Sequence, residues 1–243
     1  MKIGIISDTH CNIDALKIAF KEFEKEDVDK LICVGDVIGI GPYPAECMDL
    51  LMENKEKFLC FVRGNHEGYL LKGLPKRSHD ESNGQPLSLD ELNMFKWNHS
   101  KLSNSHIEFI KTWNDRADLE IEGKKIVVEH YPIDKNGKFK KFCARPTYEQ
   151  IDKLCEEKNA DVFIFGHTHN ELYYNENDKT YINPGSLGCP IVTDAANFGI
   201  LEIDSKVSYK QLNIKYDVDK VIDDINKLNY PVHSLMIKIF YRR

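Results

Sequence analysis

Side chains that can bind metal ions follow short apolar segments at five places in the sequence. In chain order these places are Asp8-Thr9-His10, Gly35-Asp36, Gly64-Asn65-His66, His130 and Gly166-His167-Thr168-His169. Residues two apart on an extended segment project to the same side, so the first group, and the two histidines of the last, could each direct a pair of ligands to one point. The sequence therefore predicts that donors from distant segments converge on a metal site.

The predicted ligands combine oxygen and nitrogen donors. They are Asp8, His10, Asp36, Asn65, His130, His167 and His169. Such a mixture without a thiolate favours Mn²⁺, Fe or Zn²⁺ over Ca²⁺ or an iron-sulfur cluster. Seven donors exceed the needs of one tetrahedral ion, whereas two ions that share Asp36 would use them all. Phosphatases and nucleases hold such pairs of ions about 3.5 to 4 Å apart.

Four of the five groups have a structural interpretation when they are taken alone, whereas Gly166-His167-Thr168-His169 favours a metal site even alone. The first could begin a capped helix, the second could form a turn, Asn65 could occupy a left-handed turn, and His130 could be a buried structural histidine. The occurrence of all five groups in this order favours a shared site. Gly35, Gly64 and Gly166 each precede a predicted ligand, and we expect them to allow a sharp or positive-φ backbone there.

The elements that must position these groups follow from the hydrophobic pattern. Three apolar segments, 2–7, 31–34 and 58–62, are predicted strands, and helices are predicted to begin after Asn12 and at Pro44. This alternation predicts a parallel sheet with right-handed crossovers. Ligands of layered α/β proteins bind beyond the carboxyl ends of strands, which is where the polar groups stand.

The rest of the chain is predicted to add helices and short strands to one domain that spans residues 1–243. Capping boxes at Ser88, Ser105 and Thr147 predict three helix starts. Predicted strands cover 119–122, 125–129, 162–165, 171–174, 179–182, 198–203 and 207–216, and a final helix covers 218–228. The strands of this second half are expected to be mainly antiparallel. Segment 67–86 has no periodicity and is expected to lie near the site, because long irregular segments are often functional.

Composition and charge exclude several classes of protein. The 243 residues carry 33 Lys and Arg against 39 Asp and Glu, a net charge of −6 without a long block of one sign, which argues against a dedicated nucleic-acid binder. Apolar runs are far shorter than the ~20 residues that span a bilayer, and the first residues resemble a buried strand more than a secretory signal. Seven cysteines without a CxxC pair argue against a disulfide framework. We therefore expect a cytoplasmic protein that does not act at a membrane.

Taken in order, the five groups resemble the signature of the calcineurin-like metallophosphoesterases, which reads D-x-H, G-D, G-N-H-[DE], a later H, and G-H-x-H. The resemblance covers residues 3 to about 203. Segments 35–42, 62–67 and 183–188 are similar to a bacterial and archaeal branch of small phosphodiesterase-like enzymes. The resemblance implies an α/β (α+β) fold in which two mixed sheets form a sandwich with helices on both outer faces.

The resemblance also implies a role for each predicted site residue. One metal ion would be held by Asp8, His10, Asp36 and His169, and the other by Asp36, Asn65, His130 and His167. His66 matches the histidine beside the leaving group, where it could protonate the departing alkoxide; holding Asn65 or a carboxylate in place is its alternative role. Asn65 and His66 would contact the substrate. The implied activity is hydrolysis of a phosphodiester or phosphomonoester by a hydroxide that bridges two divalent or transition metal ions.

Departures from the family pattern narrow the expected function. Ser/Thr protein phosphatases continue G-D with x-x-D-R-G, but residues 37–41 offer neither that aspartate nor that arginine. Tyr131-Pro132 follows His130, where many members have glycine, so a phenol is expected near the cleft. A small phosphate ester is the expected substrate. The alternatives are a dinucleoside polyphosphate hydrolase and a non-catalytic protein-binding scaffold, like the similar retromer subunit. The complete ligand set favours an enzyme.

Two basic groups stand in irregular segments beside the motifs. The first comprises Lys72, Lys76, Arg77 and His79, and the second comprises Lys135, Lys138, Lys140, Lys141 and Arg145. Either group could bind a second phosphate or a nucleotide tail, although solvated lysines are the commoner case. His99, His106 and His233 belong to no motif and are interpreted as structural.

Overall fold

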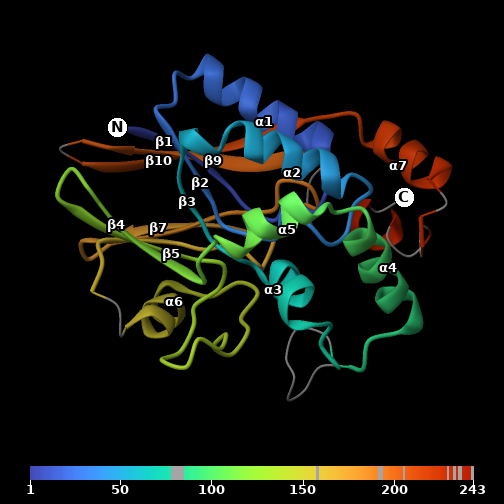
Figure 1. The fold of residues 1–243 in the computed structure, drawn as a ribbon. Coiled ribbons are helices and arrows are strands. Elements are labelled where there is room, and N and C mark those ends of the chain that lie inside the picture. The colour runs from blue at the N-terminus through green and yellow to red at the C-terminus, as the bar shows by residue number, and fades with distance from the viewer. Residues whose placement is uncertain are drawn as a thin grey trace.

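Two mixed five-stranded sheets form the centre of the protein (Figure 1). The computed structural model describes residues 1–77, 85–156, 159–190, 194–204, 206–228, 230–231, 234 and 237–241. The first sheet contains, in spatial order, β10 (Val207–Lys215), β9 (Ala195–Ile203), β1 (Lys2–Ile6), β2 (Lys30–Cys33) and β3 (Phe58–Phe61). The second contains β4 (Arg116–Ile121), β5 (Lys124–Glu129), β6 (Val162–Ile164), β8 (Lys179–Pro184) and β7 (Glu171–Glu176). The predicted α/β class and two-sheet architecture are confirmed.

The core between the sheets is built from β-branched and other apolar side chains of both. Ile5 of β1 and Ile32 of β2 pair in parallel register, and both side chains are fully buried. They pack in one cluster with Val128 of β5 and Ile164 of β6 from the opposite sheet. This shared core fixes the two sheets relative to each other, and with them the loops at the ends of their strands.

Helices cover both outer faces (Figure 1). Over the first sheet lie α1 (Ile13–Lys25) and α2 (Pro44–Glu53), and over the second lies α6 (Tyr148–Cys155). Helix α1 begins where Asn12 accepts a hydrogen bond from the Ala15 N–H, as predicted, and it buries Leu16 and Phe23 against the first sheet. Further helices are α3 (Asn65–Lys72), α4 (Leu89–Ser100), α5 (Asn104–Lys111), α7 (Val218–Lys227) and a short π-helix (Ile237–Tyr241).

The expectation of a mainly antiparallel second half is wrong for the centre of the second sheet. Strand β6 is parallel to both β5 and β8, while β4 and β7 add antiparallel edges. Helix α6 connects β5 to β6 as a crossover, a connection that parallel strands require. As a result, the segments that follow β5 and β6 leave the sheet at the same edge.

Two helix predictions need correction. Segment 67–86 is not irregular from its start, because α3 covers Asn65–Lys72; an internal Gly68 and a Gly64 N-cap hide this short helix from pattern analysis. Helix α5 begins after Ser103, not Ser105: the Ser103 hydroxyl accepts from the His106 N–H, and His106 Nδ1 accepts from the Ser103 N–H. His79 and His233 lie outside the described residues.

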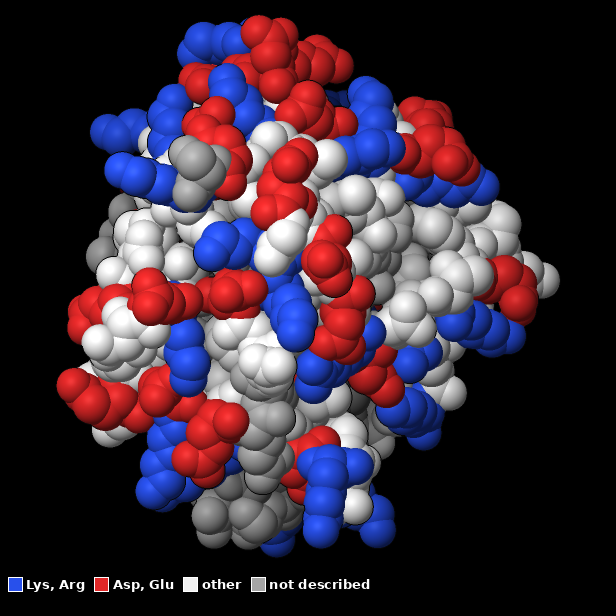
Figure 2. Space-filling view, turned by 90° about the vertical axis from the view of Figure 1, so that its left-hand side faces the viewer, with Lys and Arg blue, Asp and Glu red and all other residues white. Residues whose placement is uncertain are grey.

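The surface at the end of the sandwich where β1 begins carries both signs of charge. Figure 2 shows lysine and arginine side chains interspersed with aspartate and glutamate on this face, without a continuous block of either sign. In the part of the chain that the structure describes, no helix is both long and apolar enough to span a lipid bilayer.

Candidate metal centre

Loops from the two sheets meet at the carboxyl ends of β1, β2, β5 and β6. In the first sheet, the Asp8 N–H donates to Gly35 O at 3.0 Å, and the His10 N–H donates to Asp36 O at 3.0 Å. A third bond joins the sheets, because the His167 N–H donates to Asp8 Oδ2 at 3.0 Å. Backbone hydrogen bonds therefore hold these four predicted ligands in place.

Several predicted ligands occupy strained backbone. Positive φ angles occur at Asp8 (52°), His10 (45°), Asp36 (50°), His167 (65°) and His169 (57°). The expectation that the two paired motifs are extended is therefore wrong, because their side chains are aimed by left-handed residues. Such conformations are costly for residues other than glycine and persist only where the surroundings impose them, most often at functional sites.

The three glycines before the predicted ligands act in two different ways. Gly35 has a φ of 93°, as expected for a sharp turn. Gly64 and Gly166 are absent from the positive-φ residues and instead allow close approach of other groups. A Cβ on Gly64 would lie 2.0 Å from Asp36 Oδ1, and one on Gly166 would lie 1.9 Å from Ser7 Oγ. These two glycines leave room for the carboxylates of Asp36 and Asp8 and for Ser7.

The first cluster comprises Asp8, His10 and His169, whose ligand atoms lie within 4.8 Å of one another. His169 Nε2 is 3.3 Å from Asp8 Oδ1 and 3.0 Å from His10 Nε2. Both histidines have a backbone carbonyl opposite Nδ1: Ile38 O for His10 at 3.3 Å and Cys189 O for His169 at 3.0 Å. A proton on each Nδ1 leaves the Nε2 lone pairs directed into the site, the tautomer that metal-binding histidines adopt.

The second cluster comprises Asp36, His130 and His167, again within 4.8 Å. His130 Nε2 is 3.1 Å from Asp36 Oδ2, and its Nδ1 is 2.7 Å from Val34 O. His130 Nε2 also lies 4.0 Å from Asp8 Oδ1 of the first cluster. Asp36 further forms a group with His10 and His66. Asp36 therefore lies between the two clusters, which is the position that a ligand shared by two ions would need.

Buried oxygen atoms without hydrogen bonds fit a bound cation. Within the described residues, Asp8 Oδ1 and Asn65 Oδ1 are buried and accept no hydrogen bond. Asn65 is the first residue of α3 and directly precedes His66. Leaving buried acceptors unsatisfied costs about 1 to 3 kcal/mol each, a cost that metal coordination would remove. The residues present therefore fit the divalent metal ions that the sequence predicts.

The charges in the site also fit a cation. Burial acts to raise the pKa of Asp8, but the facing imidazoles of His169 and His130 lower it to about 2. Burial acts to lower the pKa of His130, but the carboxylate of Asp36 raises it to about 10. The site thus combines ionised carboxylates with a strongly held imidazole proton. A metal ion would take the place of that proton when it binds.

His66 lies beside the clusters at the amino end of α3. It is 8% exposed, and its Nε2 is 3.9 Å from Asp36 Oδ2. Its ring contacts those of His10 and Phe95 at centroid distances of 5.0 and 5.3 Å. The position permits contact with a ligand at the centre. It also permits metal coordination, because His66 shares a candidate group with His10 and Asp36.

Sequence reasoning assigned no role to Glu67, which organises the backbone around Asp36. Its fully buried carboxylate accepts hydrogen bonds from the N–H groups of Asp36, Val37, Ile38 and Gly64 at 2.8 to 3.2 Å. Burial, with a contribution from Asp36, raises its pKa to about 7. Glu67 occupies the acidic last position of the motif G-N-H-[DE], and this position is the sequence signal that could have revealed its role. Glu67 is a positioning residue for Asp36.

We expect Glu67→Gln to destabilise the metal-free protein by about 3 kcal/mol, because the amide group would face two N–H donors that now bond to the carboxylate. Urea unfolding measures this loss, and metal content should fall with it. Glu120→Gln, an exposed change on β4, is the matched control. Equal stability and metal content in the two variants would refute the positioning role.

Other buried polar residues that the sequence did not reveal connect the loops. Ser186 Oγ donates to Asp8 O at 2.8 Å, and Asn183 Nδ2 donates to Gly166 O at 2.8 Å. Both belong to segment 183–188, which the resemblance singled out without a role. His106, interpreted as structural, caps α5 and lies 2.7 Å from Asp49.

Comparisons with known proteins identify the family of this chain and agree with its fold. The family model for the calcineurin-like phosphoesterase superfamily domain matches residues 1–206. The chain therefore belongs to the calcineurin-like phosphoesterase superfamily.

Individual relatives cover nearly the whole chain. An uncharacterized protein of Methanocaldococcus jannaschii is 26% identical over 94% of this chain and 93% of its own length. A phosphodiesterase of the same organism is 24% identical over 87% of this chain and 98% of its own. The crystal structure of a hypothetical protein from Pyrococcus horikoshii matches with a TM-score of 0.82 at 17% identity, covering 98% of both chains. The fold is thus shared with an archaeal protein of low sequence identity.

Proposed function

We propose that this protein is a phosphoesterase that uses two divalent metal ions to hydrolyse a phosphodiester. The observation that carries the proposal is the pair of three-residue clusters, Asp8-His10-His169 and Asp36-His130-His167, with Asp36 also close to His10. Membership of the calcineurin-like phosphoesterase superfamily supports the reaction class, and the phosphodiesterase relative supports a diester substrate. We infer the metal to be Mn²⁺, Fe or Zn²⁺ from the nitrogen and oxygen donors.

The chain's own residues divide the work of this reaction. The ions would be held by Asp8, His10, Asp36, Asn65, His130, His167 and His169. When bound, such ions activate water near neutral pH and neutralise charge on phosphoryl oxygens. His66 lies where it can donate a proton to the departing oxygen, and Tyr69 and Phe95 pack around its ring. Glu67 keeps the Asp36 loop in place.

Chelation tests the proposal directly. Removal of metal should abolish hydrolysis of bis(p-nitrophenyl) phosphate, and added Mn²⁺ should restore it, because no side chain here is proposed as the nucleophile. Protein taken through the same dialysis without chelator is the control. Full activity in the metal-free protein would refute the proposal.

A further inference from the structure

A cavity of about 670 Å³ lies directly beside the candidate metal centre. It shares Gly64 and Asn65 with the centre and extends along α3 to Lys76 and Arg77. A volume of this size suits a ligand larger than one phosphate group, since small-molecule sites commonly measure about 300 to 1,000 Å³. The cavity can therefore hold a part of the substrate that lies beyond the reacting phosphoryl group.

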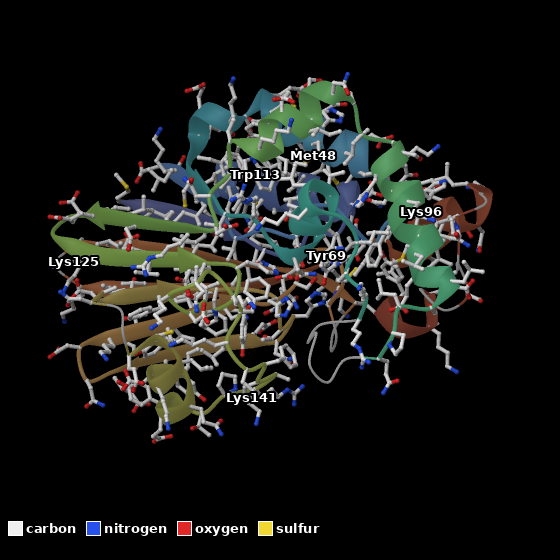
Figure 3. All side chains as sticks on the ribbon, turned by 60° about the horizontal axis from the view of Figure 1, so that its bottom comes forward. Met48, Tyr69, Lys96, Trp113, Lys125 and Lys141 are labelled. Atoms are coloured by element: carbon white, nitrogen blue, oxygen red, sulfur yellow. The ribbon has the colours of Figure 1, made fainter. Side chains whose placement is uncertain are left out.

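Two aromatic side chains connect the cavity to the histidines of the centre. Tyr69 of α3, which is labelled in Figure 3, lines the cavity. The centroid of its ring lies 5.5 Å from that of the His66 ring. Phe139 also lines it, and its ring lies 5.3 Å from that of His167. The cavity thus borders both the proposed proton donor and the second metal cluster.

The described residues that line the cavity are mainly basic, although the whole protein is acidic. Its described charged residues are Arg63, Lys72, Lys76, Arg77 and Asp115, four cations against one anion. Arg63 donates to Asp115 at 2.9 Å, so these two charges offset each other. Lys72 and Lys76 are exposed, and no carboxylate in the described part of the chain pairs with either. Among the described residues, Lys72 and Lys76 therefore add positive charge to the lining of this cavity in a chain of net charge −6.

The second basic loop does not contribute its lysines to this lining. Ile133, Gly137 and Phe139 of that loop line the cavity, but Lys135, Lys138, Lys140 and Lys141 do not. Arg145 donates to Asn170 at 3.0 Å and lines a separate cavity. Of the two basic groups, only the one that follows His66 is placed to bind an anion beside the centre.

We propose that this cavity binds a second phosphate of the substrate, held by Lys72 and Lys76 while the first phosphate occupies the metal centre. The inference rests on the proposed function and narrows it to esters or anhydrides that carry at least two phosphates. A single exposed charge pair contributes little to the free energy of binding. We therefore expect the two lysines together to change the apparent affinity for a substrate with two phosphates about tenfold.

Two matched substrates isolate this contribution. The p-nitrophenyl esters of thymidine 5′-monophosphate and thymidine 5′-diphosphate release the same nitrophenolate and differ by one phosphate. The variant with Lys72→Met and Lys76→Met keeps the aliphatic stems and removes both charges. This variant should raise KM for the diphosphate ester about tenfold and change KM for the monophosphate ester less than about twofold. It should also reduce the salt dependence of KM for the diphosphate ester.

A double variant with Lys96→Met and Lys141→Met, two residues labelled in Figure 3, is the control. It removes two exposed charges that are not among the residues lining the cavity. It should leave both substrates unchanged. An equal effect of the cavity variant on the two esters, or no effect on either, would overturn the inference.

Failure of the proposed function would look different. If the metal-loaded wild type hydrolyses neither ester, the phosphodiesterase proposal fails and calorimetric binding then decides the role of the cavity. Thymidine 5′-diphosphate should bind about tenfold more tightly than the monophosphate, and the cavity variant should remove this preference. Equal affinities in the wild type would overturn the inference.

Discussion

Replacement of His66 by alanine is expected to lower kcat by about 10² for a phosphodiester with a poor alkoxide leaving group, while about two metal ions per chain remain bound. The proposed role of His66 is to protonate the departing oxygen. The loss should therefore shrink for a nitrophenyl ester, whose leaving group needs little protonation. Rates with both esters and elemental analysis of the same sample measure the effect.

This result would separate two roles that the geometry permits. His66 Nε2 is 3.9 Å from Asp36 Oδ2, and His66 forms a candidate metal group with His10 and Asp36. If the variant loses metal, or slows both esters equally, His66 is a ligand or an anchor for the phosphoryl group instead of an acid. Lys96→Ala is the control, since this exposed residue of α4 belongs to none of the clusters.

Asp36→Asn is expected to reduce metal content at both sites and to lower kcat/KM on the order of 10³. Asp36 lies close to His130, and it shares a second group with His10 of the first cluster. The amide keeps the size of the side chain but removes the negative charge that two cations would share. Manganese binding and hydrolysis of bis(p-nitrophenyl) phosphate measure the loss.

Two comparisons give this prediction its specificity. His10→Ala should empty mainly one site, because His10 belongs to the first cluster. Asp118→Asn, an exposed change on β4, should leave metal content unchanged. Equal loss of a single ion in Asp36→Asn and His10→Ala would contradict the shared position of Asp36.

The sequence predicts the strands well where apolar segments alternate with helices that have clear starts. The segments around β1, β2 and β3 are apolar and separated by helices with clear starts at Asn12 and Pro44, and the parallel sheet follows. The parallel order of β5, β6 and β8 was missed because strand direction depends on long-range pairing. Short β-rich segments separated by turns do not encode that direction locally.

Sequence reasoning also grouped the candidate ligands more reliably than it explained their geometry. The sequence predicts the six aspartates and histidines of the two clusters, but it wrongly attributes the aim of the Asp8–His10 and His167–His169 pairs to extended backbone. The positive φ of Asp8 and His167 depends on hydrogen bonds with distant segments, which no local pattern contains. Glu67 was overlooked for the same reason, since its partners lie as far as 31 residues away.

Titration of the metal-stripped protein with Mn²⁺ tests the central claim most directly, with hydrolysis of bis(p-nitrophenyl) phosphate as the readout. The two clusters around Asp36 predict that the rate rises until two equivalents of Mn²⁺ per chain have bound and then stays constant. A full rate before any Mn²⁺ is added, or a plateau at one equivalent, would contradict a phosphoesterase that works through two ions.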